Sequence, residues 1–190
     1  MWRSNARQGS DGVQQVAVLS EEKLLADARA GDQTSFERLI EPHIGLGYRL
    51  AAAMLNDASQ AEDAVQEATL RAWRSIRQLR SSAQIRGWFL SIVANRSRSM
   101  RSTRWWSVIR LPGPLWRSPS PTEALDRHQD LAIALGRLSA EERAAVLLRF
   151  YEDMTSREVG QALGITASAA RSRIRRALQR LRVDLAEEEL

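Results

Sequence analysis

The chain has no cysteine and little of the other material from which catalytic and metal sites are built. None of its 190 residues is cysteine, and His43 and His128 are its only histidines. Disulfides and thiolate metal sites are therefore excluded, and a histidine metal centre or nucleophile has almost no residues to use. A glycine motif that could cradle phosphate is also missing. We therefore expect no enzymatic activity, no bound metal and no cofactor.

Long apolar runs and strand-like patterns are equally scarce. The residues up to Val18 are polar and contain Gly and Ser, and the apolar run among them is too short for a signal peptide or a membrane span. Together with the missing cysteine, this predicts a cytoplasmic protein. No run of alternating β-branched residues is present, so the sequence predicts an all-α fold.

Acidic residues are absent from two long tracts. No Asp or Glu occurs from Ala68 through Thr122, or between Val159 and Val183, and both tracts are rich in arginine. The net charge of +5 hides this segregation because the remaining segments carry the carboxylates. A tract that carries positive charges and no negative ones attracts a polyanion such as DNA. The sequence therefore predicts two separate nucleic-acid-binding surfaces.

The C-terminal tract has the pattern of a helix-turn-helix. Thr155 and Glu158 have capping-box spacing, Gly164 stands where a helix would end in a left-handed residue, and Thr166 can cap a second helix. That second helix has an apolar stripe formed by Ala170, Ile174, Ala177, Leu178 and Leu181. An ordinary surface helix with a solvated charged face is the alternative, but such a face normally mixes charge signs. The pattern favours a helix that reads the DNA major groove.

Helical periodicity also organises the rest of the chain. The first half predicts helices over residues 20–31, 32–55, 60–76 and 85–100, with the second kinked or interrupted near Pro42. Trp88 and Phe89 lie on the apolar side of the last of these helices. Core packing is favoured for both, although aromatic wedges that unstack bases are an alternative.

Prolines separate the two halves. Pro112, Pro114, Pro119 and Pro121 forbid a regular element, and Ser139 with Glu142 then opens another helix at capping-box spacing. Before it, Leu125, Leu131, Ala132, Leu135 and Leu138 are expected to form the inner face of a first helix. The predicted division is a disordered N-terminal extension over 1–19, a helical domain over 20–103, a flexible Pro-rich linker over 104–121, a second helical domain over 122–185 and an acidic tail over 186–190.

Three segments together resemble one known family. AEDAVQEATLRAW (61–73) looks like region 2.2 of the extracytoplasmic-function (ECF, group 4) bacterial sigma factors of the sigma-70 family, and IRGWFLSIVANRSRSMR (85–101) looks like their regions 2.3 and 2.4. The segment from Leu138 to Arg182 resembles region 4, with its helix-turn-helix. The order of the segments and the linker between them also resemble this family.

The resemblance implies a factor that binds core RNA polymerase, recognises the −35 and −10 promoter elements and opens the DNA. The implied partners are the β′ coiled coil of polymerase for region 2, the β flap for region 4, duplex DNA at −35 and single-stranded DNA at −10. An anti-sigma factor binds many relatives, although no residue pattern here reveals one. The implied core-polymerase residues are Asp63, Gln66 and Glu67. The implied −10 residues are Arg80, Ser81, Ser82, Asn95, Arg96, Arg98 and Arg101. The implied −35 residues are Ser168, Arg171, Ser172, Arg173, Arg175 and Arg176.

Two departures from the family pattern affect base preference. Ser99 stands where the family usually has an acidic residue, and Ser168 to Ala170 replace a Gly-Thr-Val-like triplet at the start of the recognition helix. An alternative function is a stand-alone helix-turn-helix regulator that binds duplex DNA without polymerase, as a dimer on two half-sites.

Overall fold

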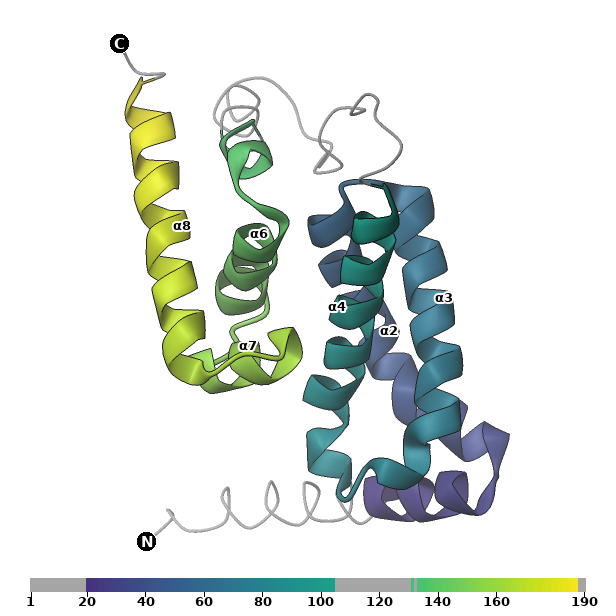
Figure 1. The fold of residues 1–190 in the computed structure, drawn as a ribbon. Coiled ribbons are helices and arrows are strands. Elements are labelled where there is room, and N and C mark those ends of the chain that lie inside the picture. The colour runs from purple at the N-terminus through teal and green to yellow at the C-terminus, as the bar shows by residue number, and fades with distance from the viewer. Residues whose placement is uncertain (1–19, 105–130, 132, 188–190) are drawn as a thin grey trace, which may run out of the picture.

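The computed structural model describes residues 20–104, 131 and 133–187, and every regular element among them is helical (Figure 1). The N-terminal bundle contains a helix over residues 20–30, α2 (Gln33–Leu55), α3 (Ala58–Ser75) and α4 (Ile85–Arg104). Two 3-10 turns, η1 (Ile76–Gln78) and η2 (Ser82–Gln84), join α3 to α4. The all-α prediction is confirmed. The expected extension 1–19, residues 105–130 with the proline-rich linker, and residues 188–190 of the tail lie outside the described residues.

Helix α2 is continuous, so of the expected kink or interruption near Pro42 the interruption is wrong. Pro42 lies inside the helix and is exposed. A proline removes one backbone hydrogen bond, and the buried apolar stripe on the other side of α2 holds the turns together. Gly47 has a packing role, because a Cβ placed there would lie 3.0 Å from Cε1 of Phe89. The glycine therefore allows α4 to approach α2 closely.

The C-terminal unit consists of a short helix over 133–137, α6 (Ala140–Val146), the π-helical turn η3 (Leu147–Tyr151), α7 (Ser156–Leu163) and α8 (Ala167–Glu187). Both predicted capping boxes are present: Ser139 with Glu142 opens α6, and Thr155 with Glu158 opens α7. Gly164 ends α7 with φ of 65°, as predicted. The helix-turn-helix is thus built from the local signals in its sequence.

One apolar cluster runs through both parts of the molecule. It includes Phe89 and Leu90 of α4 together with Val159 and Leu163 of α7, all of them essentially inaccessible. Phe89 is therefore a core residue, and Trp88 packs half-buried against the same cluster. In Figure 1 the C-terminal unit lies along the bundle with α7 against α4 and α8 on the outer side.

The helix before α6 is less buried than expected. Leu138 is buried and Leu135 half-buried, but Leu131 is 41% exposed, so its assignment to the inner face is wrong. Leu138 and Leu135 pack in a small cluster with Ala177, Leu178 and Leu181 of α8, and Leu131 is not part of that cluster. Leu125 and Ala132 lie outside the described residues.

Candidate nucleic-acid interface

Helix α8 presents a cationic face to solvent and an apolar face to the protein. Arg171, Arg175 and Arg176 are exposed, whereas Ala170 and Ala177 are completely buried. The helix begins where the hydroxyl of Thr166 accepts a hydrogen bond from the amide of Ala169 at 3.1 Å. Ser168 is exposed beside this first turn and Ser172 half-buried one turn later. This is the arrangement that a major-groove helix needs, with its N-terminal residues and arginines free to reach DNA.

Two arginines of α8 are instead bound to carboxylates of α6. Nη1 of Arg173 lies 3.0 Å from Oε2 of Glu141, and Nη1 of Arg180 lies 3.0 Å from Oε2 of Glu142. Arg173, a predicted −35 residue, therefore points toward the protein in this arrangement. Sequence periodicity placed it at the edge of the apolar stripe and could not show which neighbour it meets.

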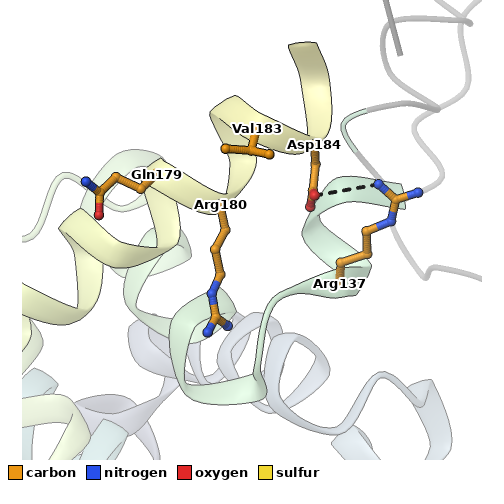
Figure 2. Close-up of a pocket in the computed structure, with 5 residues that line it drawn as sticks. All are labelled: Arg137, Gln179, Arg180, Val183 and Asp184. Atoms are coloured by element: carbon orange, nitrogen blue, oxygen red, sulfur yellow. Dashed lines mark ion pairs between the residues drawn. The ribbon is translucent and has the colours of Figure 1, made fainter. Parts of the chain in front are cut away.

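The far end of α8 borders a shallow hollow, shown in Figure 2. Its wall includes Val183, which is 56% exposed, and the ion pair of Arg137 with Asp184 at 3.7 Å. No cluster of three or more potential metal ligands occurs in the described part of the chain. The hollow thus offers mixed charge and a little apolar surface, without a catalytic constellation.

The predicted −10 loop is held by hydrogen bonds to the helix over residues 20–30. One oxygen of Glu22, Oε1, accepts hydrogen bonds from the Ser81 hydroxyl at 2.9 Å and from the Ser82 amide and hydroxyl at 2.8 and 2.9 Å. These bonds hold the pKa of Glu22 below its usual value. Ser82 is buried and Ser81 half-buried, while Arg80 is exposed. The two serines therefore shape the loop, and Arg80 is the side chain that it offers to solvent.

Helix α4 carries the remaining predicted −10 residues in two environments. Asn95 and Arg101 are exposed. Nη2 of Arg96 lies 2.5 Å from Oε1 of Glu67 on α3, so a predicted −10 residue is paired with a predicted polymerase residue. Arg98 is bound to Glu141 of the C-terminal unit, with Nε 2.8 Å from Oε1. Contacts with α3 and with the C-terminal unit thus leave only part of this basic helix open.

The predicted polymerase face lies on the outer side of α3. Asp63 and Gln66 are exposed, and Glu67 is half-buried in its ion pair. Leu70, which the sequence reasoning missed, is 57% exposed and follows Gln66 by one helical turn. A single exposed leucine is common on protein surfaces, and this one adds an apolar side chain beside the polar residues of the predicted polymerase face. Its place outside the predicted apolar stripe was the available signal.

A second missed feature is aromatic. Phe150 and Tyr151 in η3 are 55% and 70% exposed. The guanidinium carbon of Arg49 lies 5.7 Å from the centroid of the Tyr151 ring, within cation–π range. Both aromatics lie at the C-terminal end of the helical segment that Ser139 and Glu142 open. The π-helical turn changes the period at this point and brings them to the surface.

No helix in the described ranges 20–104, 131 and 133–187 is both long enough and apolar enough to cross a bilayer.

Comparison with known proteins gives the family. Residues 39–107 match the family model "Sigma-70 region 2" and residues 134–183 match "Sigma-70, region 4". The chain is 31% identical over 173 residues to the ECF RNA polymerase sigma factor SigL of Mycobacterium tuberculosis, covering 86% of this chain and 96% of SigL. It is 30% identical over 169 residues to the RNA polymerase sigma-E factor of Streptomyces coelicolor, covering 84% and 91% of the two chains.

Two solved structures share the fold. CnrH in complex with the cytosolic domain of CnrY is similar with a TM-score of 0.64 and 24% identity, over 88% of this chain and 98% of that one. The sigma factor RpoE of Bartonella quintana, in complex with the anti-sigma factor NepR, has a TM-score of 0.66 and 22% identity, over 80% and 96% of the chains. On the sequence matches, this chain belongs to the ECF sigma factors of the sigma-70 family, which act in transcription initiation by RNA polymerase.

Proposed function

We propose that the chain is the promoter-reading subunit of a polymerase holoenzyme, with each task assigned to a separate helix. Helix α8 reads the −35 duplex through Arg171, Arg175 and Arg176. Its acid-free, exposed arginine face over a fully buried alanine stripe is the observation that carries the proposal. Reading by this face needs no catalytic chemistry from the chain.

Helix α4 and the loop before it contact the single-stranded −10 element. Arg80, Asn95 and Arg101 are the side chains already exposed there. Single-stranded DNA is held by a basic surface that follows its backbone. The sequence from Ala68 through Thr122 contributes no carboxylate of its own, and the acids that pair with α4 come from α3 and α6. We assign Ser81 and Ser82 a supporting part through the loop that they hold to Glu22.

Helix α3 docks on the polymerase. Asp63, Gln66 and Glu67 provide polar contacts, and Leu70, one turn after Gln66, adds exposed apolar surface next to them. We further assign the chain to group 4, the class with only regions 2 and 4, and place its action in the cytoplasm, where bacterial polymerase meets the chromosome. Domain limits at residues 20–103 and 122–185 belong to the same proposal.

The test is transcription from a genomic promoter library by core polymerase with and without this chain. We expect initiation at a subset of promoters only when both are present. Leu70→Ala should weaken core binding, whereas Ala83→Ser, at an exposed position away from α3, should leave it unchanged. A dimeric chain that footprints duplex DNA without polymerase, and initiates nowhere with it, would overturn the proposal.

An inhibitory protein partner is a further part of the proposal. CnrH is bound to the cytosolic domain of CnrY in its structure, and the sigma factor RpoE is bound to the anti-sigma factor NepR. In this chain Leu70, Phe150 and Tyr151 provide exposed apolar surface for such a partner. We expect a second protein to co-purify with the chain, and its removal to restore binding to core polymerase. If its removal leaves core binding unchanged, the protein is not an inhibitor.

A further inference from the structure

The helix over residues 20–30 holds the predicted −10 loop immediately after Arg80. Oε1 of Glu22 accepts hydrogen bonds from the Ser81 hydroxyl at 2.9 Å and from the Ser82 amide and hydroxyl at 2.8 and 2.9 Å. Ser82 is 2% exposed and Ser81 is half-buried. A carboxylate oxygen only accepts, so both hydroxyl protons are committed to Glu22. Neither serine hydroxyl is therefore free to donate to DNA.

The same helix holds the loop immediately before Arg80. Nη2 of Arg29 donates a hydrogen bond to the backbone carbonyl of Leu79, which is 2% exposed. Glu22 and Arg29 are seven residues apart in the sequence. This spacing is two helical turns, so both side chains lie on one face of the helix, about 10.5 Å apart along its axis. In Figure 1 this helix is purple and lies beside the loop that joins α3 to α4.

The backbone between the two anchors is extended. Leu79 has φ of −72° and ψ of 124°, and Ser81 has φ of −147° and ψ of 144°. Extended chain rises about 3.3 Å per residue, so the three steps from residue 79 to residue 82 span about 10 Å. This length matches the separation of the two anchoring side chains on the helix. Successive side chains of an extended segment alternate in direction, and accordingly Leu79 is buried, Arg80 exposed and Ser81 half-buried.

We propose that Glu22 and Arg29 are positioning residues, which fix the chain on each side of Arg80 and present its guanidinium to the −10 strand. The inference rests on the proposed function of this loop as a −10 contact. Because the loop is already ordered, Arg80 binds the strand without the cost of ordering it at that moment. Ser81 and Ser82 act through the shape of the loop, and Arg80 makes the contact with DNA.

The anchoring is tested first, by hydrogen exchange of the peptide covering residues 79–84 in the full chain at pH 7. Glu22→Gln weakens the anchor after Arg80, and Arg29→Met removes the anchor before it. Ser82→Ala is a milder change that removes one of the three hydrogen bonds to Glu22. The control is Glu21→Gln, which makes the same charge change at the exposed neighbouring position. We expect faster exchange in the first three variants and no change in the control.

The positioning role is tested second, by binding of the holoenzyme to a forked DNA with a single-stranded −10 segment, taken from a promoter at which this chain initiates. Arg80→Ala and Glu22→Gln are compared singly and together in a double-mutant cycle. We expect Glu22→Gln alone to weaken binding about fivefold, the loss produced when the presenting conformation falls to about one fifth of the population. In the presence of Arg80→Ala, the same change should alter affinity by less than about twofold.

Three outcomes contradict different parts of the argument. Unchanged exchange over residues 79–84 in folded Glu22→Gln and Ser82→Ala would overturn the anchoring. An equal loss of affinity from Glu22→Gln with and without Arg80 would overturn the positioning role, because a general structural defect does not depend on Arg80. Faster exchange, in a chain whose DNA binding Arg80→Ala leaves unaffected, would support the anchoring and contradict the proposed −10 role of this loop.

Discussion

At the scale of single residues, the arginines of α8 differ in what they can do. Arg176 is exposed and opposite the apolar stripe, whereas Arg173 is held by Glu141. A guanidinium free in solvent can fork onto a guanine edge or hold a phosphate. An arginine already paired must first lose its partner. Exposure therefore ranks these side chains in a way that their spacing in the sequence does not.

The change Arg176→Ala should reduce −35-dependent initiation with little loss of core binding. The expected cost is about 1–3 kcal/mol of promoter affinity, or roughly fivefold to 150-fold, if Arg176 contacts a base edge. Transcription and a core pull-down measure the two effects. Arg182→Ala, an exposed arginine later on the same helix, is the control. Equal losses in transcription and core binding would indicate misfolding instead.

At the scale of elements, Glu22 ties the helix over 20–30 to the loop between α3 and α4. Three hydrogen bonds from Ser81 and Ser82 converge on one carboxylate oxygen. The guanidinium of Arg29 also donates to the carbonyl of Leu79, so the same helix holds the loop at two points. The conformation of the predicted −10 loop thus depends on a helix about 60 residues earlier in the chain.

Glu22→Gln should flatten part of the acid dependence of stability. Hydrogen bonds from Ser82 and Ser81 lower the pKa of Glu22 in the folded state. A lowered folded-state pKa means that the stabilisation is complete above the unfolded value of about 4.3 and is lost as pH falls through the folded value. Urea unfolding from pH 6 to pH 2.5 measures this slope.

The control for this prediction is Glu21→Gln, at the exposed neighbouring position. That variant should keep the wild-type slope. Glu22→Gln should be less stable than wild type at pH 6 and approach it at the acid end. A constant difference between the two proteins at every pH would show that the hydrogen bonds to the carboxylate are not the cause.

At the scale of the whole molecule, both apolar and ionic contacts hold the C-terminal unit on the N-terminal bundle. Val159 and Leu163 of α7 are buried in the same cluster as the core of the bundle. Half-buried ion pairs such as Arg98 with Glu141 lose much of their Coulomb gain to desolvation, so this apolar contact supplies much of the attachment. The carboxylates supply its register, since they fix which turn of α4 meets α7.

A bulky side chain in the contact between α4 and α7 should separate the two units. A Cβ at Gly87 would already lie 3.3 Å from Oε1 of Gln161, so Gly87→Leu places a branched side chain where α7 packs. We expect a larger hydrodynamic radius by sedimentation. Calorimetry should resolve two unfolding transitions in this variant and a single transition in the unmodified chain. Ser102→Leu, on the exposed end of α4, should change neither. An unchanged hydrodynamic radius in Gly87→Leu would show that the contact between α4 and α7 accommodates the leucine and that the two units stay together.

The sequence by itself determined the local structure of this protein. Both capping boxes, the left-handed Gly164 and the apolar stripe of α8 follow from chemistry within a few residues, and all are present. It also determined the family, because the segments of regions 2 and 4 each match by sequence. Charge segregation located both basic tracts, since acids are missing from them regardless of fold.

Only the tertiary structure decided which of those cations are free. The pairing of Arg98 and Arg173 with Glu141, and of Arg96 with Glu67, joins residues far apart in the chain, and no local pattern encodes such partners. The same holds for the continuity of α2 through Pro42, which depends on packing against α3 and α4. Tertiary contacts divide the candidate DNA-binding arginines into two groups. Some are exposed to solvent, and the others are paired with a carboxylate.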